Sequence, residues 1–80
     1  MIKLTYYIDD YAFERVCYNL PDLVAALVAL INNHFTGHEV TPELVNGHLE
    51  VAIIKAVEVF NAELLSYSVN YYKIERITET

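Results

Sequence analysis

The apolar residues of segment 20–35 recur every three or four positions, which is the spacing of one face of an α-helix. Asn19 precedes this segment as an N-cap, and Pro21 and Asp22 fall in its first turn. Gly37 stands where a glycine commonly ends a helix. We therefore predict a helix over 20–35. Its apolar face consists of Leu20, Leu23, Val24, Leu27, Leu30, Ile31 and Phe35.

The opposite side of this helix carries alanines where charged residues normally stand. These are Ala25, Ala26 and Ala29, and no charged residue occurs between Asp22 and Glu39 while the histidines are neutral. A helix that is apolar all round is normally buried on more than one side. The sequence therefore predicts that a second surface covers this helix.

A second helix is expected over 42–65, because Thr41 is a good N-cap and Pro42 suits the first helical position. Asn46-Gly47 also permits a hairpin turn followed by a strand through the β-branched run 51–59. We favour the helix because the apolar stripe stays in register past Glu63. The stripe contains Leu49, Ile53, Ala56, Val57, Phe60 and Leu64, while Glu43, Glu50, Glu58 and Asn61 face outward.

The ends of the chain have the alternating pattern of β-strands. Residues 2–18 predict a β-hairpin that turns at Asp9-Asp10. Residues 67–77 predict one strand whose apolar parity switches at Tyr71-Tyr72, which indicates a bulge or a strand covered on both faces. The predicted fold is therefore one α+β domain over 1–80, of order ββααβ. We expect a three-stranded antiparallel sheet with two helices packed on one face.

Composition excludes several functional classes. The longest apolar run, Leu23 to Ile31, has nine residues, whereas a membrane span needs about 20. The N-terminus alternates like a strand, so we expect no signal peptide. A single cysteine, Cys17, cannot form an internal disulfide, and we expect it to be a small buried hydrophobe in a cytoplasmic protein. A net charge of −6 argues against direct binding of nucleic acid or of anionic membranes.

No catalytic, metal or cofactor signature is recognisable. His34 and His38 are four residues apart, but Gly37 between them at the helix end removes the shared face that zinc would need. His48 lies ten residues further on. The pair Asp9-Asp10 is more typical of a solvated turn than of acid–base catalysis. We therefore expect neither an enzyme nor a cofactor.

Charge and tyrosine content point to a protein interface instead. Segment 19–65 holds six acidic residues against Lys55, a balance of −5, whereas the predicted strand segments are nearly neutral. All seven tyrosines fall on predicted strands, and adjacent pairs place rings on both faces of the sheet. The residues expected to bind a partner are Tyr7, Tyr11 and Tyr72 on the sheet and Glu43, Glu50, Ile54 and Glu58 on the second helix.

The acidic helix suits a partner with a basic surface. Glu43, Glu50 and Glu58 are spaced by about 11 Å along a helix, too sparsely to mimic duplex DNA with its charge every ~1.7 Å. We expect instead a limited acidic patch that meets a basic groove. Val51, Ile54 and Leu65 add apolar surface among these glutamates, so a homodimer is also expected.

Three functions follow in order of preference. Short, acidic, tyrosine-rich domains without motifs are typical of accessory proteins of phage and other mobile elements. Some of these inhibit host defence enzymes such as restriction or CRISPR nucleases. The first expectation is such an inhibitor, acting in the host cytoplasm if a phage encodes it. The second is a structural or assembly subunit whose function is its own oligomer. The third is a small ligand-binding domain or enzyme using His34, His38 and Asp9.

Overall fold

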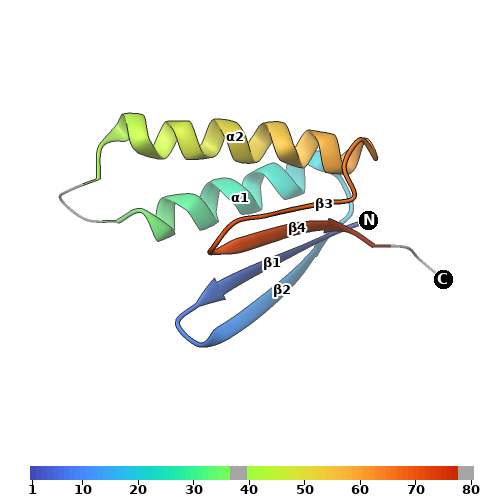
Figure 1. The fold of residues 1–80 in the computed structure, drawn as a ribbon, viewed down its shortest axis with the longest axis horizontal. Helices are drawn as coiled ribbons and strands as arrows, with labels where there is room; N and C mark the ends of the chain where they lie inside the picture. The colour runs from blue at the N-terminus through green and yellow to red at the C-terminus, as the bar shows by residue number, and fades with distance from the viewer. Residues whose placement is uncertain (37–39, 78–80) are drawn as a thin grey trace.

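The computed structural model describes residues 1–36 and 40–77 and has an α+β architecture. Two helices lie side by side on one face of an antiparallel sheet (Figure 1). The sheet has four strands in the order β2-β1-β4-β3, not the three that we expected from the sequence. In sequence order, the first two strands precede the helices and the last two follow them.

The N-terminal hairpin agrees with the sequence pattern. β1 (Ile2–Ile8) pairs antiparallel with β2 (Tyr11–Cys17), and only Asp9 and Asp10 separate them. Asp9 has a φ of 53°, and the two favoured two-residue hairpin turns both require a positive φ at this position. Asp tolerates this conformation better than most residues, which is why a hairpin forms here without glycine.

Helix α1 (Leu20–His34) and helix α2 (Pro42–Phe60) both begin at the expected caps. The side chain of Asn19 accepts a hydrogen bond from the backbone N–H of Asp22 at 2.9 Å, and Thr41 does the same for Leu44 at 3.2 Å. Helix α2 runs through Asn46-Gly47 without a break, so the alternative of a hairpin and a strand over 51–59 is wrong.

The expected end of the second helix at residue 65 is also wrong, because α2 ends at Phe60. Ala62 takes a left-handed conformation with a φ of 64°, and the backbone N–H groups of Glu63 and Leu64 turn back onto the carbonyl of Glu58. Glycine usually occupies such a position. Because position 62 holds alanine, the sequence carries no signal that the helix ends here. Gly37, the expected end signal of α1, lies outside the described residues.

The predicted strand 67–77 is in fact two strands, β3 (Ser66–Ser68) and β4 (Tyr72–Arg76). The backbone N–H of Val69 donates to the carbonyl of Tyr72 at 2.9 Å and closes a tight turn at Asn70-Tyr71. A two-residue turn puts the residues before and after it on the same face of the sheet. The parity switch at Tyr71-Tyr72 therefore marks a reversal of the chain, not a bulge.

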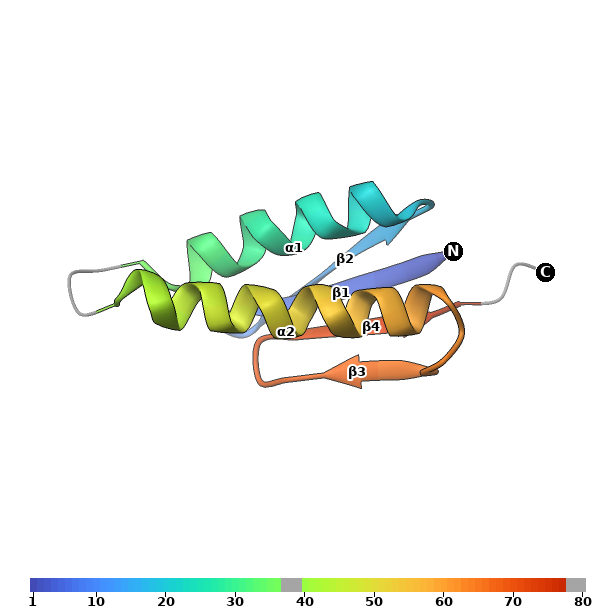
Figure 2. The same cartoon turned by 90° about the horizontal axis from the view of Figure 1, so that it is seen from above.

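The helices cover the face of the sheet that carries the alternating apolar residues. Figure 2 shows α1 above the β1–β2 side and α2 above the β4 side. The buried core between the layers consists of Ile2, Leu4, Cys17, Leu23, Ala26, Leu27, Ile31, Ala52, Ala56, Val59, Tyr72 and Ile74. The expected packing of both helices on one face is confirmed.

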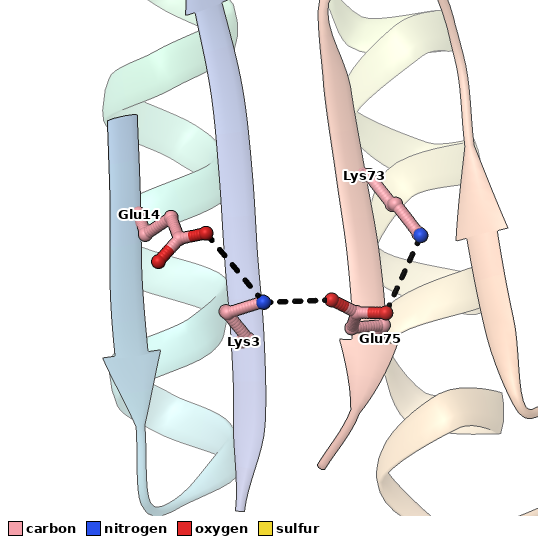
Figure 3. A network of polar contacts seen from close by, with 4 residues as sticks. All are labelled: Lys3, Glu14, Lys73 and Glu75. Carbon is pink, nitrogen blue, oxygen red and sulfur yellow. Dashed lines mark ion pairs between the residues drawn. The ribbon is translucent and has the colours of Figure 1, made fainter. Parts of the chain in front are cut away.

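The opposite face of the sheet is polar. Lys3 on β1 lies 3.5 Å from a carboxylate oxygen of Glu14 on β2 and 3.1 Å from one of Glu75 on β4. Lys73 contacts the other oxygen of Glu75 at 3.3 Å, and Figure 3 shows the four side chains on the face away from the helices. The hydrogen bond from Lys3 lowers the pKa of Glu75. Charge pairs, not the expected tyrosines, therefore dominate this face.

A long-range contact completes α2, whose last turn contains no basic residue. Arg76 at the end of β4 donates from Nη1 to the carbonyl oxygens of Phe60 at 2.8 Å and Val59 at 3.3 Å. These carbonyls lack partners within the helix, and a guanidinium there also favours the negative end of the helix dipole. The sheet thus caps the helix that lies on it.

Within 1–36 and 40–77, neither helix combines the length and the apolar character needed to cross a membrane.

Candidate functional site

An open groove of about 670 Å³ lies between α2 and the β3–β4 hairpin. We call it the α2 groove. Two turns of α2 form one wall, and β3 with the turn at Asn70-Tyr71 forms the other. Its floor is mostly apolar and aromatic. The groove is lined by Glu43, Leu44, Gly47, His48, Val51, Tyr67, Val69, Asn70, Tyr71 and Tyr72.

Gly47 opens the helix wall of this groove. A Cβ atom added at Gly47 would meet no other atom within 4 Å. Glycine in a helix interior costs roughly 1 kcal/mol relative to alanine, and here no crowding within the chain requires it. The sequence thus forgoes stability at a position where the bare helix backbone lines an open groove and permits close approach of another molecule.

The outer face of α2 beside the groove combines acidic and apolar side chains. Glu43, Glu50 and Ile54 are exposed there, as expected from the sequence, and so is Val51. Among the described residues, Glu43 and Glu50 make no ion pair, whereas Glu58 is half-buried and lies 3.4 Å from the ammonium of Lys55. The unpaired carboxylates on this face are therefore those of Glu43 and Glu50, near the groove, whereas the carboxylate of Glu58 is paired with Lys55.

Tyr71 closes one end of the groove and joins it to α1. Its ring stacks on His34 at 3.9 Å between centroids and contacts Phe35 edge-on at 5.8 Å. Its hydroxyl lies 3.5 Å from Nδ1 of His48 on α2. Burial raises the pKa of the Tyr71 phenol above its ordinary value. The cluster fixes the turn at Asn70-Tyr71 against both helices and gives this end of the groove a rigid aromatic wall.

Comparisons with protein-family models, with curated proteins and with solved structures found no match.

The geometry of the surface must therefore carry any functional assignment, and it places the three tyrosines expected at an interface very differently. Tyr72 is only 2% exposed and belongs to the core, so the expectation of an exposed ring there is wrong. Burial also raises its pKa. Tyr7 on β1 is 42% exposed and Tyr11 on β2 is 70% exposed. Both lie on the N-terminal hairpin. Tyr11 is on the edge strand β2, opposite β3, whereas the backbone N–H of Tyr7 donates to the carbonyl of Tyr71 at the end of the α2 groove.

His34, His48 and the pair Asp9-Asp10 are the described residues among those considered for metal binding or acid–base chemistry. Among the described residues, no three His, Cys, Asp or Glu side chains lie close enough together to hold a metal ion. His38, the expected partner of His34, lies outside these residues. Asp9 and His34 do line a common hollow of about 340 Å³ between the hairpin tip and the end of α1, together with Tyr7, Ile8, Leu30 and Asn33.

Cys17 is buried at the end of β2, as expected of a small hydrophobe. Desolvation raises the pKa of its thiol and outweighs the opposing effect of the nearby Arg15 guanidinium. A protonated, inaccessible thiol is a poor nucleophile.

Sequence reasoning missed the second wall of the groove. Tyr71, Val69 and Asn70 reach it only because the chain reverses between β3 and β4. The parity switch at Tyr71-Tyr72 was the one available signal. A switch of this kind is equally compatible with a bulge, so the pattern alone did not distinguish the two structures.

Proposed function

We propose that this chain is a small acidic protein-binding module whose partner presents a basic surface, and that the partner docks in the α2 groove. The observation that carries the proposal is the open, mostly apolar groove at Gly47 beneath the unpaired carboxylates of Glu43 and Glu50. An apolar floor beside an acidic rim suits an apolar side chain flanked by lysine or arginine. Tyr67 and Tyr71 supply aromatic contact area of the kind enriched at interfaces.

The proposal extends to inhibition of a nucleic-acid-processing partner. A surface that binds nucleic acid carries clustered cations, and an acidic rim attracts the same cations by the same electrostatics. A bound module of this size then blocks the nucleic acid sterically. The role is that of an accessory protein of phage or mobile-element type acting on a defence enzyme in the host cytoplasm, such as a restriction or CRISPR nuclease.

A small-molecule site or an enzyme is the weaker candidate. Pockets that bind small ligands enclose most of the ligand surface, whereas the α2 groove is open to solvent along the helix. Its polar groups are Glu43, His48, Asn70 and the hydroxyl of Tyr71. An open groove of this kind favours a macromolecule over an enclosed ligand. The homo-oligomer alternative depends on a different surface, the free edge of β2.

The test is parallel affinity capture with the tagged chain and its surface variants, using lysate from the cells in which the protein occurs. Gly47→Arg places a bulky cation in the groove and offsets one of its two rim carboxylates, while it replaces glycine by a better helix former. The double variant Glu43→Lys/Glu50→Lys reverses the rim alone. Glu63→Lys is the matched control, because Glu63 is exposed outside the groove.

We expect the unmodified chain and Glu63→Lys to retain a stoichiometric protein that Gly47→Arg and the double variant lose, with binding weakened at least about tenfold. The captured protein should bind nucleic acid when it is free and lose that affinity in the complex. Equal recovery by all four chains would locate the interface elsewhere. Recovery of no stoichiometric protein by the unmodified chain would contradict the binding function itself.

A further inference from the structure

Strand β2 forms an edge of the sheet, and along most of its length both faces are exposed. Figure 1 shows that the β1–β2 hairpin is the part of the sheet away from α2. Phe13 is 43% exposed and Val16 is 40% exposed, in addition to the ring of Tyr11. Proteins normally protect such long apolar edges, because an unpaired strand is a template for another strand.

The hydrogen-bond pattern shows which backbone groups of β2 are free. The N–H of Tyr7 donates to the carbonyl of Tyr71 beyond β4, so the odd-numbered residues of β1 point toward β4. Alternate residues of a strand bond to opposite neighbours. The even-numbered residues of β1 therefore bond to their odd-numbered partners in β2. This leaves the N–H and C=O groups of Ala12, Glu14 and Val16 directed at the free edge.

Charge selects one way of pairing this edge with itself. An antiparallel β2–β2′ pair about a two-fold axis that keeps at least five of the seven residues of β2 paired centres on position 13, 14 or 15. Centring on Glu14 places two carboxylates opposite each other, and centring on Arg15 does the same for two guanidinium groups. Like charges directly opposite destabilise a strand pair. Centring on Phe13 avoids both.

The register centred on Phe13 also makes favourable contacts. The two Phe13 rings meet at the axis, next to Tyr6, which already stacks on Phe13 at 5.3 Å between centroids. Tyr11 faces Arg15 of the second copy, which is a cation–π pair. Ala12 and Glu14 of the second copy exchange backbone hydrogen bonds. Among the described residues Arg15 makes no ion pair, so its charge is available for this contact.

Beyond Asp22 in its first turn, the helix nearest to this edge carries no charged side chains that would repel the same helix of a second copy. Helix α1 lies above the β1–β2 side of the sheet (Figure 2), and it has no charged side chain between Asp22 and His34. A two-fold axis perpendicular to the sheet brings the two α1 helices side by side on the same face. Exposed Ala25 and Ala29 then meet an uncharged neighbour.

We infer that this chain forms a two-fold dimer in which β2 pairs antiparallel with β2 of a second copy, with Phe13 opposite Phe13, and creates a continuous eight-stranded sheet from two four-stranded ones. The inference does not depend on the proposed function. Because β2 and β3 are opposite edges, the dimer leaves both α2 grooves open and presents them as a bivalent pair.

Cysteine cross-linking tests the register directly. In the Cys17→Ala background, which contains no other cysteine, Phe13→Cys reports the centre at position 13. The double variant Ala12→Cys/Val16→Cys reports the centre at position 14, because residue 12 then faces residue 16 of the second copy, and it leaves the charge of Glu14 in place. Only a residue at the axis meets its own copy, and residues in a non-hydrogen-bonded pair lie about 4.5 Å apart at Cα, within the range of a disulfide. We expect a disulfide dimer of Phe13→Cys alone under mild oxidation. A disulfide dimer of Ala12→Cys/Val16→Cys, or none of Phe13→Cys, would overturn the inference.

A proline variant tests the edge without relying on new cysteines. Glu14→Pro removes an N–H that points at the free edge, so it spares the pairing of β2 with β1. We expect sedimentation to give a dimer for the unmodified chain and for Glu14→Ala, and a folded monomer for Glu14→Pro. Circular dichroism verifies that each variant is folded. A monomeric unmodified chain at high micromolar concentration, or a folded dimeric Glu14→Pro, would contradict the β2 interface.

Discussion

The imidazole ring of His34 lies flat against the phenol ring of Tyr71, with centroids 3.9 Å apart and planes inclined by only 3°. His34 is the last residue of α1, and Tyr71 lies in the turn between β3 and β4. Phe35 and His48 complete the cluster with ring centroids 4.5 Å apart. This contact therefore holds the end of one helix, the first turns of the other and the C-terminal hairpin together, and it forms the closed end of the α2 groove.

The first prediction concerns this cluster. Tyr71→Ala should lower the free energy of unfolding by about 2–3 kcal/mol, because a half-buried ring in contact with four others is lost. Tyr71→Phe keeps the ring and removes only the long 3.5 Å contact to His48, so it should change stability by less than about 0.5 kcal/mol. Urea denaturation of both variants measures the difference. Equal losses in the two would mean that the hydroxyl, not the stack, stabilises the cluster.

The second prediction separates two tyrosines that the sequence did not distinguish. Tyr72→Ala should cost about 3–5 kcal/mol, since Tyr72 is a fully packed core side chain. Tyr7→Ala should cost under about 1 kcal/mol, because that ring is 42% exposed. Thermal unfolding followed by circular dichroism compares them. A destabilising Tyr7→Ala of similar size would contradict the exposed position of Tyr7.

The third prediction concerns the open position in α2. Gly47→Ala should raise the free energy of unfolding by roughly 1 kcal/mol, because the new methyl group meets no atom within 4 Å and alanine favours the helix. Chemical denaturation measures the gain. The exposed Asn46→Ala, on the same helix but outside the groove lining, controls for general helix propensity. A loss of stability in Gly47→Ala would show that the groove wall is not open at this position.

The fourth prediction concerns acid stability. The hydrogen bond from Lys3 holds the pKa of Glu75 below its ordinary value of 4.5, so folding favours the carboxylate. Its contribution is present above pH 4.5 and is lost as the pH falls through the lowered value. Glu75→Gln should therefore be less stable than the unmodified chain near neutral pH, with the difference vanishing in strong acid.

Urea midpoints measured at neutral pH and in acid test this dependence. The effect should be small, because Lys3 and Glu75 are both partly exposed and solvent screens the pair. Glu14→Gln is the matched control, since Glu14 contacts the same lysine at 3.5 Å but is more exposed. A Glu75→Gln difference that persists unchanged in acid would contradict a role for the charged carboxylate.

Local signals predicted where both helices begin and that residues 2–18 form a hairpin. Asn19 and Thr41 cap their helices within three residues of their own position, and the Asp9-Asp10 turn joins strands that are neighbours in sequence. The apolar stripes of 20–35 and of the second helix also predicted which sides are buried. Such features depend on nearest neighbours and on the periods of 3.6 and 2, so composition and spacing suffice to read them.

The predictions that the second helix ends at residue 65 and that residues 67–77 form one strand were wrong for the same reason. Residues that are distant in the sequence decide both features. Helix α2 ends at Phe60 with Ala62 in a left-handed conformation, and Arg76, 16 residues further along the chain, caps its last carbonyls. Contacts of Tyr71 with His34 and His48 hold the turn that divides the strand. Neither contact leaves a trace in the local sequence.

The sequence by itself determined an acidic α+β chain with two capped helices, a hairpin and a surplus of apolar and tyrosine side chains. Only the tertiary structure decided where the surplus lies. Pairing of β4 between β1 and β3 buries Tyr72 and leaves Tyr11 and Phe13 on a free edge, because strand order and not residue type sets which rings the helices cover. The same order places β3 beside α2 and so creates the groove at Gly47.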